Sequence, residues 1–108
     1  MPPQSEETLD YILKEMFPDM KEEARKQWIG LFLDLQLKAE NAEISTKALD
    51  LRGLIAAART VRQGLKPFLA VQMGIINKCF DLFEKEIVRH VVSMRIPEDW
   101  TRSDVFAG

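Results

Sequence analysis

Hydrophobic residues recur every three or four positions along most of the chain, which is the spacing of one face of an α-helix. The first such stretch follows Ser5, a good helix-capping residue, and has acidic residues in its first turn. Pro18 disfavours the helical conformation of the residue before it, so this helix is expected to end near Met16. Its apolar stripe consists of Leu9, Ile12, Leu13, Met16 and Phe17.

A second helix is predicted from Asp19 to about Ala39, with Asp19 as its cap and Glu22 completing a pattern like a capping box. Its apolar face is broad enough to indicate burial from two sides. That face consists of Ala24, Trp28, Ile29, Leu31, Phe32, Leu33, Leu35 and Leu37. Residues 40–43 form a polar turn, and the β-branched stretch at 44–46 is too short for a sheet.

The third predicted helix has Asp50 as its cap, although Ser45 offers an earlier start, and it ends at Gly64. Its apolar stripe is Leu51, Leu54, Ile55, Ala58 and Val61. A fourth helix is expected to begin at Pro67, since proline is favoured at the first helical position, and to end around residues 77–80.

The fifth helix is expected to begin after Asp81, which has Glu84 three residues later, and to end before Pro97. The predicted buried stripe is Phe80, Phe83, Ile87, Val91 and Met94. The tail that follows is polar apart from Trp100, Val105 and Phe106. Aromatic residues in a tail commonly dock, either on a partner or on their own domain.

The five helices, joined by short connections and without any two-residue alternation, predict an all-α fold, a five-helix bundle. At 108 residues the chain has the length of one domain. The helical domain is expected to span residues 5–97. Residues 1–4 are expected to be disordered or left from an expression tag, and residues 98–108 form the tail.

Composition removes several classes of function. A net charge of -2 argues against nucleic acid as a partner, and no apolar run approaches the roughly 18 residues that span a membrane, so a cytoplasmic protein is expected. The single cysteine, Cys79, and the single histidine, His90, exclude a disulfide framework and leave too few ligands for a zinc site. The scattered glycines form no phosphate-binding loop, so the chain by itself is not expected to hydrolyse a nucleotide.

Arg52 and Gly53 occupy the first turn of the third predicted helix, where each carries a local penalty. A cation there opposes the helix dipole, and glycine inside a helix costs about 1 kcal/mol relative to alanine. Two adjacent penalties suggest a function, such as a guanidinium directed at an anion. The structural alternative is that Arg52 pairs with Asp50 or Glu43 and that Gly53 permits close helix packing.

Arg59 and Arg62 fall within about one quadrant of the same helix as Arg52, at 100° per residue. The three arginines form either a phosphate-facing edge or an ordinary solvated face. Trp28 and Phe32 are interpreted as core residues, with a partner-facing patch as the alternative.

Several short motifs resemble the C-terminal helical lid of the MoxR-type AAA+ ATPases, most closely the CbbQ/NorQ-like branch. The similarity covers roughly residues 5–97. It is carried by the lead-in Phe-Pro-Asp-Met, by Asp50-Leu51-Arg52-Gly53-Leu54-Ile55, by Gly64-Leu65-Lys66-Pro67, and by Ile75-Ile76-Asn77-Lys78 followed by Phe80, Asp81 and Glu84.

The resemblance implies that the chain is a fragment, a lid from a longer ATPase whose preceding AAA+ core domain holds ATP and Mg. Arg52 matches the sensor-two arginine that reaches the γ-phosphate, with Lys47 as the alternative match. Asp50, Gly53 and Arg59 would support it. No cofactor is expected for the fragment itself, and no residue within it is expected to be catalytic.

Members of the family form homo-oligomeric rings and remodel a protein client, often beside a von Willebrand A-type partner. The resemblance implies the same for the parent chain. The alternative hypothesis is a stand-alone helical adaptor that binds proteins through apolar grooves and the aromatic tail. A nucleic-acid-binding domain that uses Arg52, Arg59 and Arg62 is disfavoured by the acidic net charge.

Overall fold

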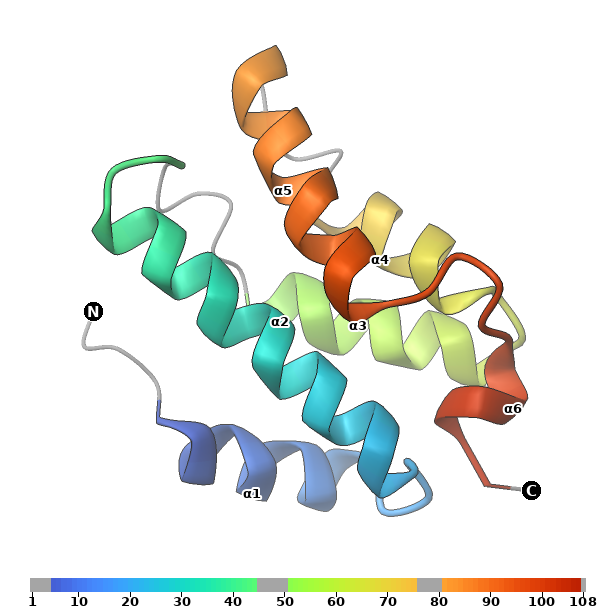
Figure 1. Cartoon of the computed structure of the whole chain (residues 1–108). Coiled ribbons are helices and arrows are strands. Elements are labelled where there is room, and N and C mark those ends of the chain that lie inside the picture. Colours follow the sequence, from blue (N-terminus) through green and yellow to red (C-terminus); the bar gives the residue numbers. More distant parts are fainter. Residues whose placement is uncertain (1–4, 45–50, 76–80, 108) are drawn as a thin grey trace.

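The computed structural model describes residues 5–44, 51–75 and 81–107, and these parts of the chain are helical, without a strand (Figure 1). The predicted all-α bundle is therefore confirmed, with one added turn of helix in the tail. The helices are α1 (Glu6–Met16), α2 (Glu22–Glu40), α3 (Leu51–Arg62), α4 (Pro67–Gly74), α5 (Leu82–Arg95) and α6 (Arg102–Val105).

Local chemistry sets several helix ends as predicted. The Ser5 hydroxyl accepts a hydrogen bond from the backbone N–H of Thr8 at 3.1 Å and caps α1. The Asp81 carboxylate accepts one from the N–H of Phe83 at 2.8 Å and caps α5. Gly64, just beyond α3, has a φ of 119°, a conformation that glycine adopts without steric cost.

The predicted cap of α2 is wrong. Lys21 occupies the capping position without a side-chain hydrogen bond, and Asp19 lies outside the helix. Asp19 contacts the tail instead: its backbone carbonyl accepts a hydrogen bond from the N–H of Ala107 at 2.9 Å. The predicted end of α4 is also too late: the helix ends at Gly74, and glycine is a poor helix former.

The predicted buried stripe of α5 is correct at Val91 and wrong at Phe83 and Met94. The helix buries Val88, Val91 and Val92, whereas Phe83 is 83% exposed and Met94 is 73% exposed. Because α5 packs against both α2 and α4, the face between those two helices is the buried one. The stripe that contains Phe83 and Met94 is displaced from it by about a third of a turn at 100° per residue. Phe80 lies outside the described residues.

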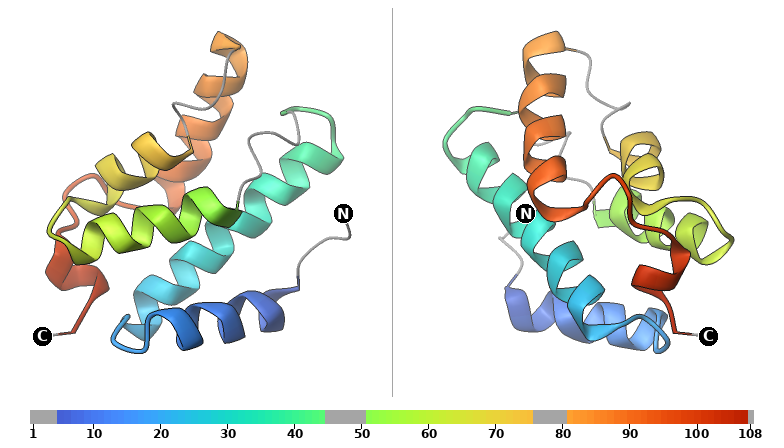
Figure 2. Two further views of the ribbon diagram at one scale, coloured as in Figure 1. Left: turned by 180° about the vertical axis from the view of Figure 1, so that it is seen from behind. Right: turned by 45° about the vertical axis from the view of Figure 1, so that its right-hand side comes forward.

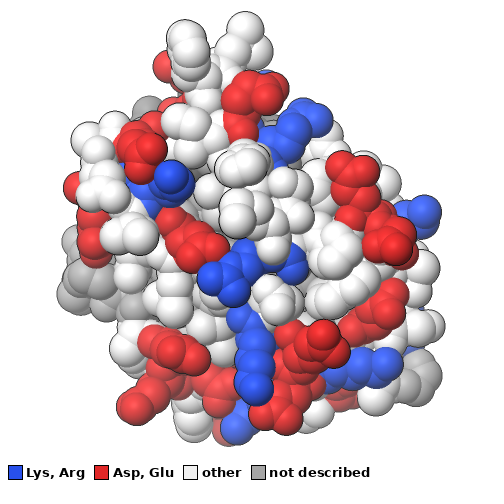
Figure 3. Space-filling view, in the orientation of Figure 1, with Lys and Arg blue, Asp and Glu red and all other residues white. Residues whose placement is uncertain are grey.

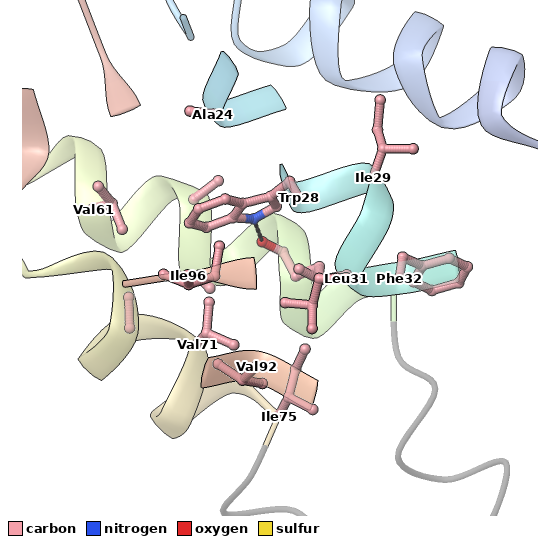
Figure 4. Packing of buried hydrophobic residues seen from close by; sticks show 14 of the residues in the cluster. Ala24, Trp28, Ile29, Leu31, Phe32, Val61, Val71, Ile75, Val92 and Ile96 are labelled. Atoms are coloured by element: carbon pink, nitrogen blue, oxygen red, sulfur yellow. Dashed lines mark hydrogen bonds between the residues drawn. The ribbon is translucent and has the colours of Figure 1, made fainter. Parts of the chain in front are cut away.

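Helix α2 lies at the centre of the fold and contacts α1, α3, α5 and α6, as its broad apolar face predicted. Trp28 is buried within this core, and its indole N–H donates a hydrogen bond to the backbone carbonyl of Leu54 at 3.1 Å (Figure 4). Phe32 is buried too, so both aromatic residues are core residues, as interpreted from the sequence. Leu37 is the exception on this helix, since it is 56% exposed.

The tail docks on its own domain, one of the two outcomes that the sequence left open. Val105 and Phe106 are buried, and the Phe106 ring meets the Phe17 ring edge-on at 5.9 Å between centroids. The backbone N–H of Lys21 donates to the carbonyl of Val105 at 2.7 Å. The tail therefore closes the end of the bundle at which α1 turns into α2, beside the end of α3 (Figure 2).

Candidate functional site

Helix α3 carries the described residues of the predicted site. Its inner face buries Gly53, Leu54 and Ala57, while Arg52 and Arg59 are exposed on its outer side. The single apolar stripe of the helix explains this orientation, because the arginines occupy the positions between the buried residues. The predicted cap Asp50 and the alternative sensor Lys47 lie outside the described residues.

Gly53 has a packing role. A Cβ atom added to Gly74 would lie 2.7 Å from the carbonyl oxygen of Gly53, so the α3 and α4 backbones approach closely at this point. The two helices lie side by side in both views of Figure 2. The structural alternative is therefore supported for Gly53, whose presence in the first turn of α3 needs no ligand to explain it.

Arg62 belongs to the contact with the tail. Its guanidinium Nη2 lies 3.2 Å from a carboxylate oxygen of Asp19, and its Cζ lies 5.9 Å from the centre of the Phe106 ring. Arg102 donates from its Nε to the backbone carbonyl of Arg62 at 2.8 Å. Of the three arginines that the sequence places along one edge of this helix, only Arg52 and Arg59 therefore remain candidates for facing a phosphate.

Glu43 was one of the two acidic residues considered as structural partners of Arg52. A carboxylate oxygen of Glu43 lies 3.4 Å from the Nζ of Lys38, so it has a basic neighbour at the end of α2. Both side chains are partly exposed, and such pairs contribute at most about 1 kcal/mol.

A groove of about 430 Å³ runs between α1 and α2, away from α3. Charged side chains dominate its lining, which consists of Glu6, Glu7, Asp10, Lys14, Glu22, Arg25, Lys26 and Ile29. Arg25 donates to Asp10 at 2.6 Å, and this hydrogen bond, with help from Lys14, lowers the pKa of the Asp10 carboxyl. The groove contains neither Arg52 nor Arg59, so it is separate from the predicted anion sensor.

An ion pair also joins α2 to α5. Arg95 donates to the two carboxylate oxygens of Asp34 at 2.7 and 3.3 Å, and the hydrogen bonds to Asp34 raise the pKa of the Arg95 guanidinium. The guanidinium lies over Gly30, where a Cβ atom would come within 2.6 Å of it. Because Gly30 has no side chain, the Arg95 guanidinium has room to lie over α2 and pair with Asp34.

Other candidate chemistry finds little support. His90 is exposed on α5, and Cys79 lies outside the described residues. The described residues contain no group of three or more potential metal ligands. None of the described helices has the length and apolarity required to cross a membrane.

No protein-family model matches the chain, and neither a curated protein nor a solved structure matches it. The resemblance to the MoxR-type lid thus remains a prediction from short motifs.

The structure also adds a feature that the sequence prediction missed, the exposed apolar stripe of α5. The signal was present in the sequence, because seven of the fourteen residues of α5 are apolar and they cover more than one face.

Proposed function

We propose that this chain is the C-terminal lid of a MoxR-type AAA+ ATPase, which closes over ATP bound in a preceding core domain and transmits hydrolysis to a client protein. The observation that carries the proposal is the exposed arginine Arg52 in the first turn of α3. It occupies the position that matches the sensor-two arginine in the family's motif.

The backbone at Arg52 is held by other helices, so this residue can move together with the whole bundle. The next two residues, Gly53 and Leu54, are buried, and Leu54 accepts the hydrogen bond of Trp28 from α2. An arginine whose backbone is fixed to two other helices in this way moves with the whole bundle. A rigid-body rotation of the bundle would follow from gaining or losing one contact at this residue.

The guanidinium is also chemically appropriate, because its fork of N–H donors can hold two phosphoryl oxygens at once. Charge on those oxygens is stabilised by fixed cations during phosphoryl transfer. The resemblance implies that ATP and Mg would be held mainly by the core domain. The contribution of this chain would be one fixed positive charge.

The test is ATP turnover by the full-length parent with Arg52→Ala. We expect kcat to fall by about a hundredfold, the usual loss when one donor to the transition state is removed. Lys26→Ala is the control, a basic residue on α2 whose side chain is 70% exposed and lies outside the predicted site, and it should change kcat by less than about twofold. Circular dichroism of both isolated variants should be unchanged.

Two results would reject this assignment. Unchanged turnover in Arg52→Ala together with a large loss in Lys47→Ala would transfer the sensor role to Lys47. Unchanged turnover in both variants would remove the sensor role from this chain, and a gene that encodes no Walker motif upstream of these residues would reject the ATPase function.

A stand-alone helical adaptor is the second candidate, and the exposed apolar side chains favour it. Leu82, Phe83 and Met94 on α5 and Met73 on α4 are each more than half exposed. Such side chains serve as anchors in protein interfaces. The aromatic tail does not support this function, because Phe106 is buried within the domain.

A further inference from the structure

The tail ends as an extended segment that pairs with the turn between α1 and α2. The backbone N–H of Lys21 donates a hydrogen bond to the carbonyl of Val105 at 2.7 Å. A second hydrogen bond runs in the opposite sense, from the N–H of Ala107 to the carbonyl of Asp19, at 2.9 Å. Phe106 lies between them, in an isolated antiparallel bridge with this turn. A domain binds an extended peptide in the same way when it pairs the peptide with its own backbone.

One aromatic and one aliphatic side chain anchor the tail. The Phe106 ring contacts Phe17, and the guanidinium carbons of Arg62 and Arg102 each lie 5.9 Å from its centre. Of residues 101–107, Phe106 and Val105 are the two that are buried. Acidic and basic side chains both reach the surface in the lower right of Figure 3, where α6 lies in the orientation of Figure 1. The contact thus has an apolar centre and a polar rim, as protein interfaces do.

The other described helices are held together without the tail. Helix α6 contacts α2 and α3, whereas α1 packs on α2, α2 packs on α3 and α5, and α4 packs on α3 and α5. Detaching the tail therefore breaks no contact between the remaining helices. Two buried side chains compensate for the ordering of the seven residues at 101–107, so the tail detaches at a lower free energy than the bundle unfolds.

We propose that residues 101–107 form a latch that opens and closes as a unit while the bundle stays folded, and that the surface beneath it is a peptide-binding seat whose ligand is this tail. The seat consists of the backbone groups of Asp19 and Lys21 and the side chains of Phe17 and Arg62. A donor and an acceptor on the bundle, with an aromatic ring and a cation beside them, select an extended segment that carries an aromatic residue.

The latch controls one connection within the bundle. When it is closed, Phe106 joins the turn after α1 to the end of α3, because it contacts both Phe17 and Arg62. The Nε of Arg102 adds a hydrogen bond to the backbone carbonyl of Arg62 at 2.8 Å. Opening removes these contacts and exposes both the seat and the Phe106 side chain. The latch does not depend on the proposed ATPase function.

Native-state hydrogen exchange of the unmodified 108-residue chain tests the opening. The amides of Lys21 and Phe106 report it, because the first donates to Val105 of the tail and the second to Arg102 within α6. We expect these two amides to have equal protection factors, about a hundredfold or more below that of Leu31 in the middle of α2. Protection of Lys21 equal to that of Leu31 would overturn the latch, because the tail would then detach only when the bundle unfolds. Much weaker protection of Phe106 than of Lys21 would show that the tail does not open as a unit.

A synthetic peptide of residues 98–108 tests the seat. It is added to the full chain with Phe106→Ala, whose own tail lacks the aromatic anchor, and the NMR signal of the Lys21 amide reports binding. We expect a dissociation constant of about 1 mM or below, since the free peptide is ordered on binding. The same peptide with Phe106→Ala is the matched control and should bind about tenfold more weakly or less.

Three results of this titration would overturn the proposal. Circular dichroism that shows Phe106→Ala unfolded would mean that the bundle depends on its tail. A peptide that leaves the Lys21 signal unchanged would mean that the tail surface is no binding seat, and equal binding of the control peptide would mean that the aromatic side chain is not recognised.

Discussion

Helices α3 and α5 differ in how completely the bundle covers their apolar residues. Helix α3 has one apolar stripe, of which Leu54, Ala58 and Val61 are buried and Leu51 and Ile55 are partly buried against the core. Helix α5 has two stripes, of which the one that contains Val88 and Val92 is buried and the one that contains Phe83 is exposed. A helix with one stripe indicates its buried face in its sequence, whereas a helix with two leaves the choice to its neighbours.

The largest expected contrast lies between a buried and an exposed member of these stripes. Leu54→Ala should lower the free energy of unfolding by about 3 kcal/mol, because Leu54 is 2% exposed and its removal leaves a cavity. Phe83→Ala should change it by less than about 0.5 kcal/mol, since Phe83 is 83% exposed. Urea denaturation of the two variants, at a concentration where the chain is monomeric, provides the measurement.

A loss in Phe83→Ala comparable to that in Leu54→Ala would contradict the comparison, because it would place Phe83 in the core. The slope of the unfolding free energy against urea concentration should be equal in the two variants. An altered slope would indicate a change in the denatured state or in the compactness of the fold.

Features that depend on a few neighbouring residues were predictable from the sequence. The caps at Ser5 and Asp81, the turn at Gly64 and the start of α4 at Pro67 each follow from the chemistry of one or two positions. The outward position of Arg52 followed in the same way, from the periodicity of α3. Local rules thus gave most helix boundaries and one candidate site residue.

Features that depend on distant residues were not predictable in this way. Asp19 has the local pattern of a helix cap, but its partners are Arg62 and Ala107, far along the chain. The docking of Phe106 on Phe17 joins residues near opposite ends of the sequence. The exposed stripe of α5 belongs to the same class, because only the positions of α2 and α4 decide which of its faces is buried.

The second contrast compares two glycines at which neighbouring helices approach closely. Gly74 allows α4 to pack against α3, and Gly30 allows Arg95 of α5 to reach α2. Gly74→Ala should lower the free energy of unfolding by about 2 kcal/mol, because the new Cβ would meet the Gly53 carbonyl oxygen at 2.7 Å and backbone cannot move aside cheaply. Gly30→Ala would meet the flexible end of Arg95 at 2.6 Å instead.

In Gly30→Ala the displaced guanidinium loses its pairing with Asp34, which costs at most about 1 kcal/mol at this exposure, while alanine favours the helix by about the same amount. The net change should be below about 0.5 kcal/mol. Thermal or urea denaturation of both variants checks the difference. A larger loss in Gly30→Ala than in Gly74→Ala would show that α5 depends on its ion pair more than α3 depends on its close packing.

The smallest expected effect concerns the ion pairs themselves, since α1 and α5 are each joined to α2 by an arginine and an aspartate. The hydrogen bond from Arg25 lowers the pKa of Asp10 below 3.8, its ordinary value. The pair therefore stabilises the fold above about pH 4, and this contribution is lost as the pH falls through the lowered pKa.

Asp10→Asn should consequently reduce the free energy of unfolding by less than about 1 kcal/mol at pH 7, because the Asp10 side chain is 35% exposed to solvent. The difference from the unmodified chain should shrink below about pH 3 and in about 1 M salt, as urea denaturation under each condition would show. A difference that persists at low pH would mean that Asp10 acts through packing. Because both helices have an ion pair of the same kind, the expected small value implies that they differ in apolar burial: the stripe of α1 from Leu9 to Phe17 is buried or partly buried, whereas Phe83 and Met94 of α5 are exposed.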